Sequence, residues 1–170
     1  MTTRLELIPL LGFPLVEPGD DLAQLILAAL RDNDLSLREG DVLVVAQKIV
    51  SKSEDRYVRL ADVKVSPEAL VLAEQAEKDP RQAQLILQES RAVLRVRPGV
   101  IIVEHRNGYV HANAGIDKSN IVRTADDPRV LLLPTDPDGS ARALREGLAA
   151  RGAIAPQVII NDSMGRAWRN

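Results

Sequence analysis

The class of fold is decided by the stretch Val42-Leu43-Val44-Val45-Ala46-Gln47-Lys48-Ile49-Val50-Ser51-Lys52. Its first five residues form a continuous and largely β-branched apolar run, which is typical of a strand that is buried on both faces. We therefore predict a central strand at 42–46. The sequence then changes to polar and basic residues, so Lys48 and Lys52 follow the carboxyl end of that strand, where open α/β sheets bind ligands.

Helices and further strands are predicted on both sides of this strand. Apolar residues at helical spacing, with capping residues or proline at the start, predict helices over 21–31, 67–77, 80–90 and 136–152. Short apolar runs predict strands at 5–11, 92–97, 131–134 and 157–160. Residues 100–112 predict a β-hairpin, because Asn107-Gly108 supplies the positive φ angles of a two-residue turn. Together these elements predict an α/β protein with a mixed sheet of the α+β type.

Composition excludes several classes of protein. The 170 residues are enough for one domain, or for one domain with a small additional lobe. Aromatic residues make up 2%, too few for a nucleic-acid surface of stacked rings, and 22 Lys and Arg against 24 Asp and Glu give a net charge of -2. The sequence has no cysteine, no signal-peptide pattern and no run of about 18 apolar residues. We expect a cytoplasmic protein that binds neither nucleic acid nor a membrane.

Oxygen ligands are the candidate site chemistry, because the phosphate-loop, dinucleotide and His-Glu-x-x-His motifs are all absent. Asp117 follows the predicted hairpin and Asp162 follows the last strand, and such carboxylates suit Mg²⁺ or Mn²⁺ beside a substrate phosphate. Asp117 with Asn120 is also typical of a turn cap, and the same alternative applies to Asp162. Lys48 and Lys52 suit either phosphate oxygens or a solvated surface. The residues alone leave these alternatives open.

The two histidines, His105 and His111, both fall near the predicted hairpin. Two such residues are too few to make a histidine-based metal cage the favoured interpretation. We therefore interpret both as surface or cross-strand residues of the hairpin.

A longer series of motifs resembles a known family. In chain order these motifs are Ser51-Lys52-Ser53-Glu54, Lys78-Asp79-Pro80-Arg81, Glu89-Ser90, Asn113-Ala114-Gly115-Ile116-Asp117-Lys118-Ser119-Asn120, Leu132-Leu133-Pro134, Asp136-Pro137-Asp138-Gly139-Ser140-Ala141 and Asp162-Ser163-Met164-Gly165-Arg166-Ala167-Trp168-Arg169. Together they are similar to the coenzyme F420-0:L-glutamate ligase family, in family order and over nearly all of residues 1–170. The resemblance implies a two-lobed catalytic fold and a homodimer.

The resemblance also implies an activity. Members of the family use GTP to add L-glutamate to the deazaflavin coenzyme precursor F420-0, and they release GDP and phosphate. The γ-phosphoryl group would activate the carboxylate of the precursor as an acyl phosphate, which the amine of glutamate then attacks. Mg²⁺ or Mn²⁺, together with K⁺, would assist the transfer of the phosphoryl group.

Roles for individual residues follow from the same match. Asp117, Asp162 and Ser163 take the positions of metal ligands, and Ser163 stands where the family usually has Thr. Nucleotide contacts are implied for Phe13, Pro14, Leu15, Val16, Gln47, Lys52 and Asn120.

The chain departs from the family pattern in the loop around residues 47–55. Gln47 stands where relatives often carry Ser, which removes a small hydroxyl beside the nucleotide. Asp55 stands where Gly usually follows Glu54, which brings a negative charge towards a phosphate site. Both changes are expected to alter nucleotide affinity or the conformation of the loop.

The family continues beyond the position of Asn170 with a segment that completes the domain and adds a further metal-binding side chain. We therefore expect a C-terminally incomplete site in residues 1–170. One alternative hypothesis is a truncated, non-catalytic module that retains nucleotide or coenzyme binding, or only dimerisation. Another is an amide ligase of the same fold with a different acceptor.

Overall fold

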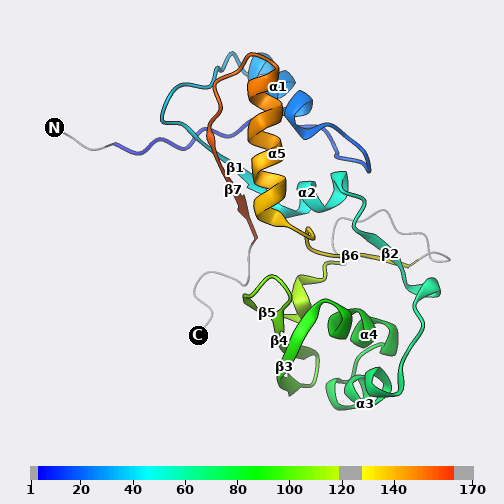
Figure 1. Cartoon of the computed structure of the whole chain (residues 1–170). Helices are drawn as coiled ribbons and strands as arrows, with labels where there is room; N and C mark the ends of the chain where they lie inside the picture. Colours follow the sequence, from blue (N-terminus) through cyan, green and yellow to red (C-terminus); the bar gives the residue numbers. More distant parts are fainter. Residues whose placement is uncertain (1–3, 119–127, 163–170) are drawn as a thin grey trace.

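The computed structural model describes residues 4–118 and 128–162 (Figure 1). The helices are α1 (Leu22–Asp32), α2 (Gln47–Ser53), α3 (Pro67–Ala76), α4 (Pro80–Gln88) and α5 (Pro137–Ala150), with short 3₁₀ turns η1 (Leu60–Asp62) and η2 (Asn113–Gly115). The strands are β1 (Val42–Ala46), β2 (Tyr57–Arg59), β3 (Ser90–Arg97), β4 (Val100–His105), β5 (Val110–Ala112), β6 (Arg129–Leu131) and β7 (Gln157–Asn161). This mixture confirms the α+β class, and the strands are divided among three small sheets instead of joining in one. No helix in the described part of the chain is long and apolar enough to span a membrane.

One lobe is built on the parallel pair β1 and β7, whose register runs from Val42 opposite Gln157 to Ala46 opposite Asn161. Helices α1 and α5 cover one face of this sheet (Figure 1). The buried core between them consists of Ala23, Ile26, Leu30, Val45, Val50, Leu144 and Leu148. The predicted helices at 21–31 and 136–152 are thereby confirmed, since their apolar stripes face this core and Asp21 and Asp136 cap their first turns.

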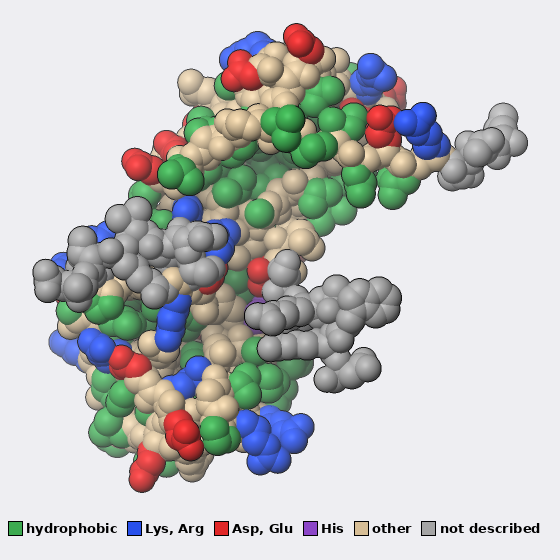
Figure 2. Space-filling model, turned by 180° about the vertical axis from the view of Figure 1, so that it is seen from behind, with side chains coloured by type: hydrophobic (Ala, Val, Ile, Leu, Met, Phe, Trp, Pro, Cys, Tyr) green, Lys and Arg blue, Asp and Glu red, His purple; other side chains and the backbone are tan. Residues whose placement is uncertain are grey.

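The prediction that β1 is buried on both faces is wrong. Val45 is 3% exposed, whereas Val42, Val44 and the neighbouring Ile159 of β7 are 51%, 59% and 51% exposed. Figure 2, seen from the side opposite to Figure 1, shows hydrophobic side chains gathered over this upper part of the molecule. A half-buried strand usually alternates apolar and polar residues, but here the uncovered face also carries valines. The sequence of β1 therefore cannot be told from that of a strand buried on both faces.

The second lobe consists of the antiparallel sheet β3–β4–β5 and helices α3 and α4. Its buried core is made of Ala69, Leu72, Ala73, Ala76, Ala83, Ile86, Ile101, Val103 and Ala114. Small alanines on the facing sides of α3 and α4 let the two short helices pack closely, and Ser66 and Asp79 cap them. The predicted helices at 67–77 and 80–90 and the predicted strand at 92–97 are confirmed.

The predicted hairpin is also confirmed, with a loop longer than the two residues expected. Glu104 pairs with Val110, and the N–H of Gly108 donates to the carbonyl of His105 at 2.8 Å. Residues 106–108 therefore form the loop, and of these Gly108 has the positive φ, at 91°. Three-residue hairpin loops also place Gly in the left-handed region, so the Asn-Gly pair fits both loop lengths.

The lobes meet at the short antiparallel pair of β2 and β6, in which Val58 lies opposite Val130. Beside this pair the Arg56 guanidinium donates to the carbonyl of Leu133 at 2.9 Å and to the carboxylate of Glu89 at 3.2 Å. Glu89 is buried at the end of α4, so this ion pair ties the segment after α2 to the second lobe. Breaking a buried pair by removing one partner is strongly destabilising.

Two predicted strands differ from the structure. Residues 5–11 form no strand, because no described segment pairs with them. Leu5, Leu7 and Leu11 are exposed, whereas Leu10 packs against the core of the first lobe. The end of this segment is held by the side chain of Asn33, which bonds to both the N–H and the carbonyl of Leu11. The strand predicted at 131–134 instead occupies Arg129–Leu131, where it can pair with β2. The residues that follow are buried, but they are not part of a β-strand.

Candidate functional site

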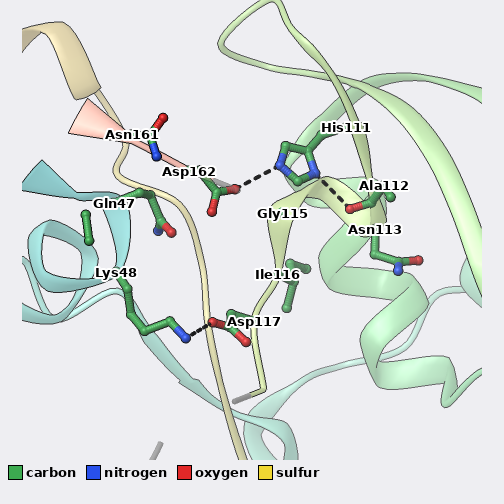
Figure 3. Close-up of a pocket in the computed structure, with 11 residues that line it drawn as sticks. Gln47, Lys48, His111, Ala112, Asn113, Gly115, Ile116, Asp117, Asn161 and Asp162 are labelled. Carbon is green, nitrogen blue, oxygen red and sulfur yellow. Dashed lines mark hydrogen bonds and ion pairs between the residues drawn. The ribbon is translucent and has the colours of Figure 1, made fainter. Parts of the chain in front are cut away.

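A cavity of about 460 Å³ lies between the two lobes, at the carboxyl ends of β1 and β7 (Figure 3). Its lining residues are Ala46, Gln47, Lys48, His111, Ala112, Asn113, Gly115, Ile116, Asp117, Asn161 and Asp162. One wall comes from the β1–α2 junction and the end of β7, and the other comes from β5 and η2. The cavity therefore lies where the carboxyl end of a parallel strand pair is expected to receive a ligand.

Asp117 is held at this cavity by its backbone and by its carboxylate. The backbone forms two hydrogen bonds of 2.9 Å with Leu131, which attach the end of the η2 segment to β6. The carboxylate accepts an ion pair of 2.5 Å from the Lys48 ammonium across the cavity (Figure 3). Both side chains are about a quarter exposed. The pair thus joins α2 to the loop after β5.

The turn before Asp117 depends on a glycine. Asn113, Ala114 and Gly115 all have positive φ angles, and the N–H of Ile116 closes the turn on the carbonyl of Asn113. A Cβ atom at Gly115 would lie 2.6 Å from the buried side chain of Leu133. Only glycine therefore combines this backbone conformation with this close approach.

Asp162 is held from the opposite wall. It follows β7 directly, and its carboxylate lies 3.0 Å from Nε2 of His111 on β5 (Figure 3). The other ring nitrogen, Nδ1, lies 3.0 Å from the carbonyl of Ala112. Because both partners are acceptors, a doubly protonated ring satisfies both contacts. The hydrogen bond to Asp162 raises the pKa of His111, and burial of the ring opposes this effect.

The donor set fits a hard divalent cation. Asp117 and Asp162 bring two carboxylates to one cavity, and the side-chain amides of Gln47 and Asn161 add neutral oxygens. Residues 4–118 and 128–162 contain no cluster of three or more His, Cys, Asp and Glu arranged to hold a metal ion. Mg²⁺ is commonly held by one or two carboxylates, with water and substrate phosphates as its other ligands. Two carboxylates in one cavity are compatible with that mode of binding.

The structure brings together four of the residues singled out from the sequence, namely Gln47, Lys48, Asp117 and Asp162. Gln47 is buried, and its amide donates to Ser51 Oγ at 2.5 Å. Lys52 lies in the last turn of α2 and does not line the cavity. Asn120 and Ser163 lie outside the described residues.

The segment Phe13–Val16 is not part of the cavity wall. Phe13 packs against the core of the first lobe and Val16 is buried, whereas Pro14 and Leu15 are exposed. In the loop after α2, Asp55 stands where the family usually has Gly, and its backbone has a positive φ of 50°. That backbone conformation favours the Gly usual at this position, and Asp is among the residues that tolerate it.

His111 was missed by sequence reasoning as a site residue, and the interpretation of both histidines as possible surface residues is wrong, since both are buried. They do lie on the hairpin, His111 on β5 opposite Val103. The predicted two-residue turn would place His111 opposite Glu104, and only the observed three-residue loop places it opposite the buried Val103, so the predicted register held no signal for this residue. The contact with Asp162, 51 positions away, left no signal in the local pattern.

An α+β protein with two carboxylates, a lysine and a buried histidine around an interlobe cavity has the kinds of side chain that bind anionic and metal-bound ligands. The family profile described as F420-0:Gamma-glutamyl ligase matches residues 11–170. Proteins named Coenzyme F420:L-glutamate ligase from Methanothermobacter thermautotrophicus and Methanopyrus kandleri are 44% and 45% identical to this chain, over 97% and 99% of its length. The corresponding protein of Halorubrum lacusprofundi is 39% identical over 98%. The chain therefore belongs to the F420-0:gamma-glutamyl ligase family, which confirms the resemblance.

The aligned regions cover 64%, 62% and 62% of these three relatives. The chain thus spans about three fifths of the length of the curated relatives that it matches.

Proposed function

We propose that this chain carries out GTP-dependent ligation of L-glutamate to F420-0. The observation that carries the proposal is the meeting of Asp117 and Asp162, from different lobes, in one cavity with Lys48 and His111. The names of the relatives support L-glutamate as a substrate. A cavity with both carboxylates and cations suits a reaction in which a metal-bound phosphate is transferred between anionic reactants.

Asp117 and Asp162 would hold Mg²⁺ or Mn²⁺, with Ser163 as a further oxygen ligand and K⁺ as an additional cation. When bound, the metal supplies positive charge that offsets the negative charge on the transferring phosphoryl group. Lys48 and His111 hold the two carboxylates in place from α2 and β5. Gln47, Lys52, Asn120 and the segment Phe13–Val16 would contact the nucleotide.

The proposed reaction has two steps. A carboxylate oxygen of F420-0 attacks the γ-phosphorus of GTP, the bond to the β,γ-bridging oxygen breaks, and GDP leaves. The nitrogen of glutamate then attacks the acyl carbon, the bond from that carbon to the phosphate oxygen breaks, and phosphate leaves while the amine loses a proton. The side chains around the cavity position the reactants and limit the access of water, which would otherwise hydrolyse the acyl phosphate.

Substitution of the two carboxylates tests the proposal. In Asp117→Asn and in Asp162→Asn we expect loss of Mn²⁺-dependent GTP binding and of turnover with F420-0 and L-glutamate, because an amide is a far weaker ligand for a hard cation. Asp32→Asn is the matched control, since Asp32 is exposed at the end of α1 and lines neither of the cavities found in the described part of the chain. Titration calorimetry with and without Mn²⁺ measures binding, and circular dichroism checks the fold.

The outcomes separate the alternatives. GTP binding in wild type without ligation of glutamate favours a nucleotide-binding module without catalysis. Turnover with a carboxylate other than F420-0 favours an amide ligase with a different acceptor. GTP binding and turnover that are unchanged in both variants would show that the assigned carboxylates are not the metal site.

We also propose that the chain forms a homodimer through the uncovered face of the β1–β7 sheet. Val42, Val44 and Ile159 form an apolar group there that the described residues leave exposed to water. Covering such a group is favourable by roughly 25 cal/mol per Å² of apolar surface.

A further inference from the structure

A second cavity, of about 340 Å³, adjoins the first on the side of the second lobe. Its lining residues are Lys78, Gln82, Ile86, Asn113, Ile116, Asp117 and Lys118. Asn113, Ile116 and Asp117 line both cavities, so the two spaces share one wall. A ligand in the second cavity would therefore lie next to the contents of the first.

The motif Lys78-Asp79-Pro80-Arg81 contributes to this cavity, and most of the motif has a structural explanation. Asp79 caps α4 by accepting from the N–H of Arg81, and its carboxylate also accepts from the Arg81 guanidinium at 2.6 Å. Pro80 occupies the first helical turn, where its missing N–H costs nothing. The helix start thus accounts for the last three residues of the motif and leaves the side chain of Lys78 without a structural role.

Lys78 is held in position by its backbone. Glu77, in the left-handed conformation, ends α3, and the N–H of Lys78 donates to the carbonyl of Ala73 at 3.0 Å. Within residues 4–118 and 128–162, the Lys78 ammonium makes no hydrogen bond or ion pair. Burial lowers the pKa of this group. A partly buried ammonium without an anionic partner is unfavourable unless a ligand supplies one.

Neutral hydrogen-bond groups complete the cavity. The Oδ1 atom of Asn113 accepts from the N–H of Ile101 at 3.0 Å, which directs the amide NH₂ away from that bond. The Gln82 side chain, in the first turn of α4, makes no hydrogen bond within the described residues. Ile86 and Ile116 provide apolar surface. The wall thus combines two lysines and two amides with an apolar patch large enough for a short aliphatic chain.

We propose that this second cavity binds a small dicarboxylic amino acid, with Lys78 and Lys118 as the partners of its two carboxylates. Lys78 and Lys118 both bring positive charge to this cavity, whereas the carboxylate of Asp117 is already ion-paired with Lys48. The wall therefore carries more positive than negative charge, which suits a ligand with more carboxylates than ammonium groups. With the carboxylates at the lysines, the amino group lies at the shared wall, facing the phosphate cavity. The identity of the amino acid as L-glutamate rests on the proposed function.

The experiment compares the binding of L-glutamate and L-glutamine, which differ in one carboxylate, to the full chain and its variants. Calorimetric titrations are run with and without Mn²⁺ and a non-hydrolysable GTP analogue. In Lys78→Met we expect L-glutamate to bind about tenfold more weakly or worse, since a charge-assisted hydrogen bond is lost. The preference for glutamate over glutamine should shrink in this variant. Lys78→Arg, which keeps the charge, should retain more of the affinity than Lys78→Met.

Lys64→Met is the matched control, because Lys64 is exposed and lines neither cavity. It should bind L-glutamate as wild type does, and the affinity of all variants for GTP with Mn²⁺ should stay within about twofold of wild type. Glutamate binding that depends on Lys78 supports this proposal even in a chain without ligase activity.

Two results would overturn the inference. The first is wild-type protein that binds GTP with Mn²⁺ but shows no saturable L-glutamate binding under either condition. The second is a Lys78→Met variant with unchanged L-glutamate affinity, whether or not the KM for F420-0 rises. Absence of GTP binding in wild type would instead contradict the proposed function.

Discussion

At the scale of single residues, His105 shows how the hairpin and the lobe junction determine a protonation state. The ring is 1% exposed and stacks on Tyr109 with centroids 5.0 Å apart. Its Nδ1 atom accepts a hydrogen bond from the N–H of Asn107 at 3.1 Å, so the proton of the neutral ring is on Nε2, 3.8 Å from Glu89 Oε2. Burial, together with the nearby positive charge of Arg106, lowers the pKa of His105 to about 4.

This lowered pKa predicts a pH-dependent stability. The unfolded chain takes up a proton at His105 near pH 6.5, whereas the folded protein does so only near pH 4. The stabilisation is therefore fully present above pH 6.5 and is lost progressively as the pH falls towards 4, by up to about 3 kcal/mol. Urea unfolding between pH 7 and about pH 5 measures this loss.

His105→Gln separates this effect from other titrating groups. The variant cannot take up the proton, so the slope of its unfolding free energy against pH should be smaller than that of wild type over the same range. Identical slopes for the two proteins would mean that His105 is protonated in the folded state as readily as in the unfolded one.

The site residues were only partly predictable from the sequence. The residue types at Asp117 and Asp162 indicated oxygen ligands, and their positions after a hairpin and after a strand indicated loops. The partners that hold them, Lys48 and His111, are set by contacts between distant parts of the chain, on which local spacing carries no information.

At the scale of elements, the turn η2 affects both the stability of the fold and the position of Asp117 in the cavity. We expect Gly115→Ala to lower the free energy of unfolding by about 2–4 kcal/mol, because the new Cβ would meet Leu133 at 2.6 Å and the residue would keep a φ of 68°. Because Gly115 lies two positions before Asp117, the variant should also bind GTP with Mn²⁺ more weakly. Urea unfolding and calorimetry measure the two effects.

Gly152→Ala is the matched control for this prediction. Gly152 has a similar φ of 80°, but a Cβ there would meet nothing within 4 Å. Its substitution should therefore lower the free energy of unfolding only by the cost of a positive φ at alanine, about 1 kcal/mol, and leave nucleotide binding unchanged. Equal losses of stability in the two variants would show that the contact with Leu133 relaxes without cost.

Elements with strong local signals were predicted well. Helices α1, α3, α4 and α5 begin at capping residues that bond to their own first turns, so a short stretch of sequence is sufficient to define each start. The segment 5–11 has the composition of a strand but has no pairing partner among the described residues. A strand needs a neighbour for its hydrogen bonds, and the presence of a neighbour is not a local property.

At the scale of the whole molecule, the uncovered face of the β1–β7 sheet predicts self-association. If a second copy covers this face, Val44→Lys should shift the protein from dimer to monomer, because it would bury an unpaired charge in the contact. Light scattering coupled to size-exclusion chromatography measures the mass of each variant. Since Val44 points away from the core, the fold should be retained.

Leu70→Lys serves as the control, since Leu70 is an exposed apolar residue of α3 in the other lobe. It should leave the mass of the dimer unchanged. A monomeric wild-type chain, or a Val44→Lys variant with the same mass as a dimeric wild type, would contradict the assignment of this face.

The sequence by itself determined four of the five described helices, the hairpin, the α+β class and membership of the family, because capping, periodicity and turn chemistry act within about ten residues and motif order is read along the chain. Helix α2, whose first turn has no side-chain cap, was not predicted. Only the tertiary structure decided which face of β1 is covered, and only it brought Lys48 to Asp117 and His111 to Asp162. The covered face of β1 is set by α1 and α5 within the first lobe, whereas the two side-chain contacts depend on how the lobes meet. Packing of this kind is a property of surfaces formed by distant segments, and no single stretch of the chain encodes it.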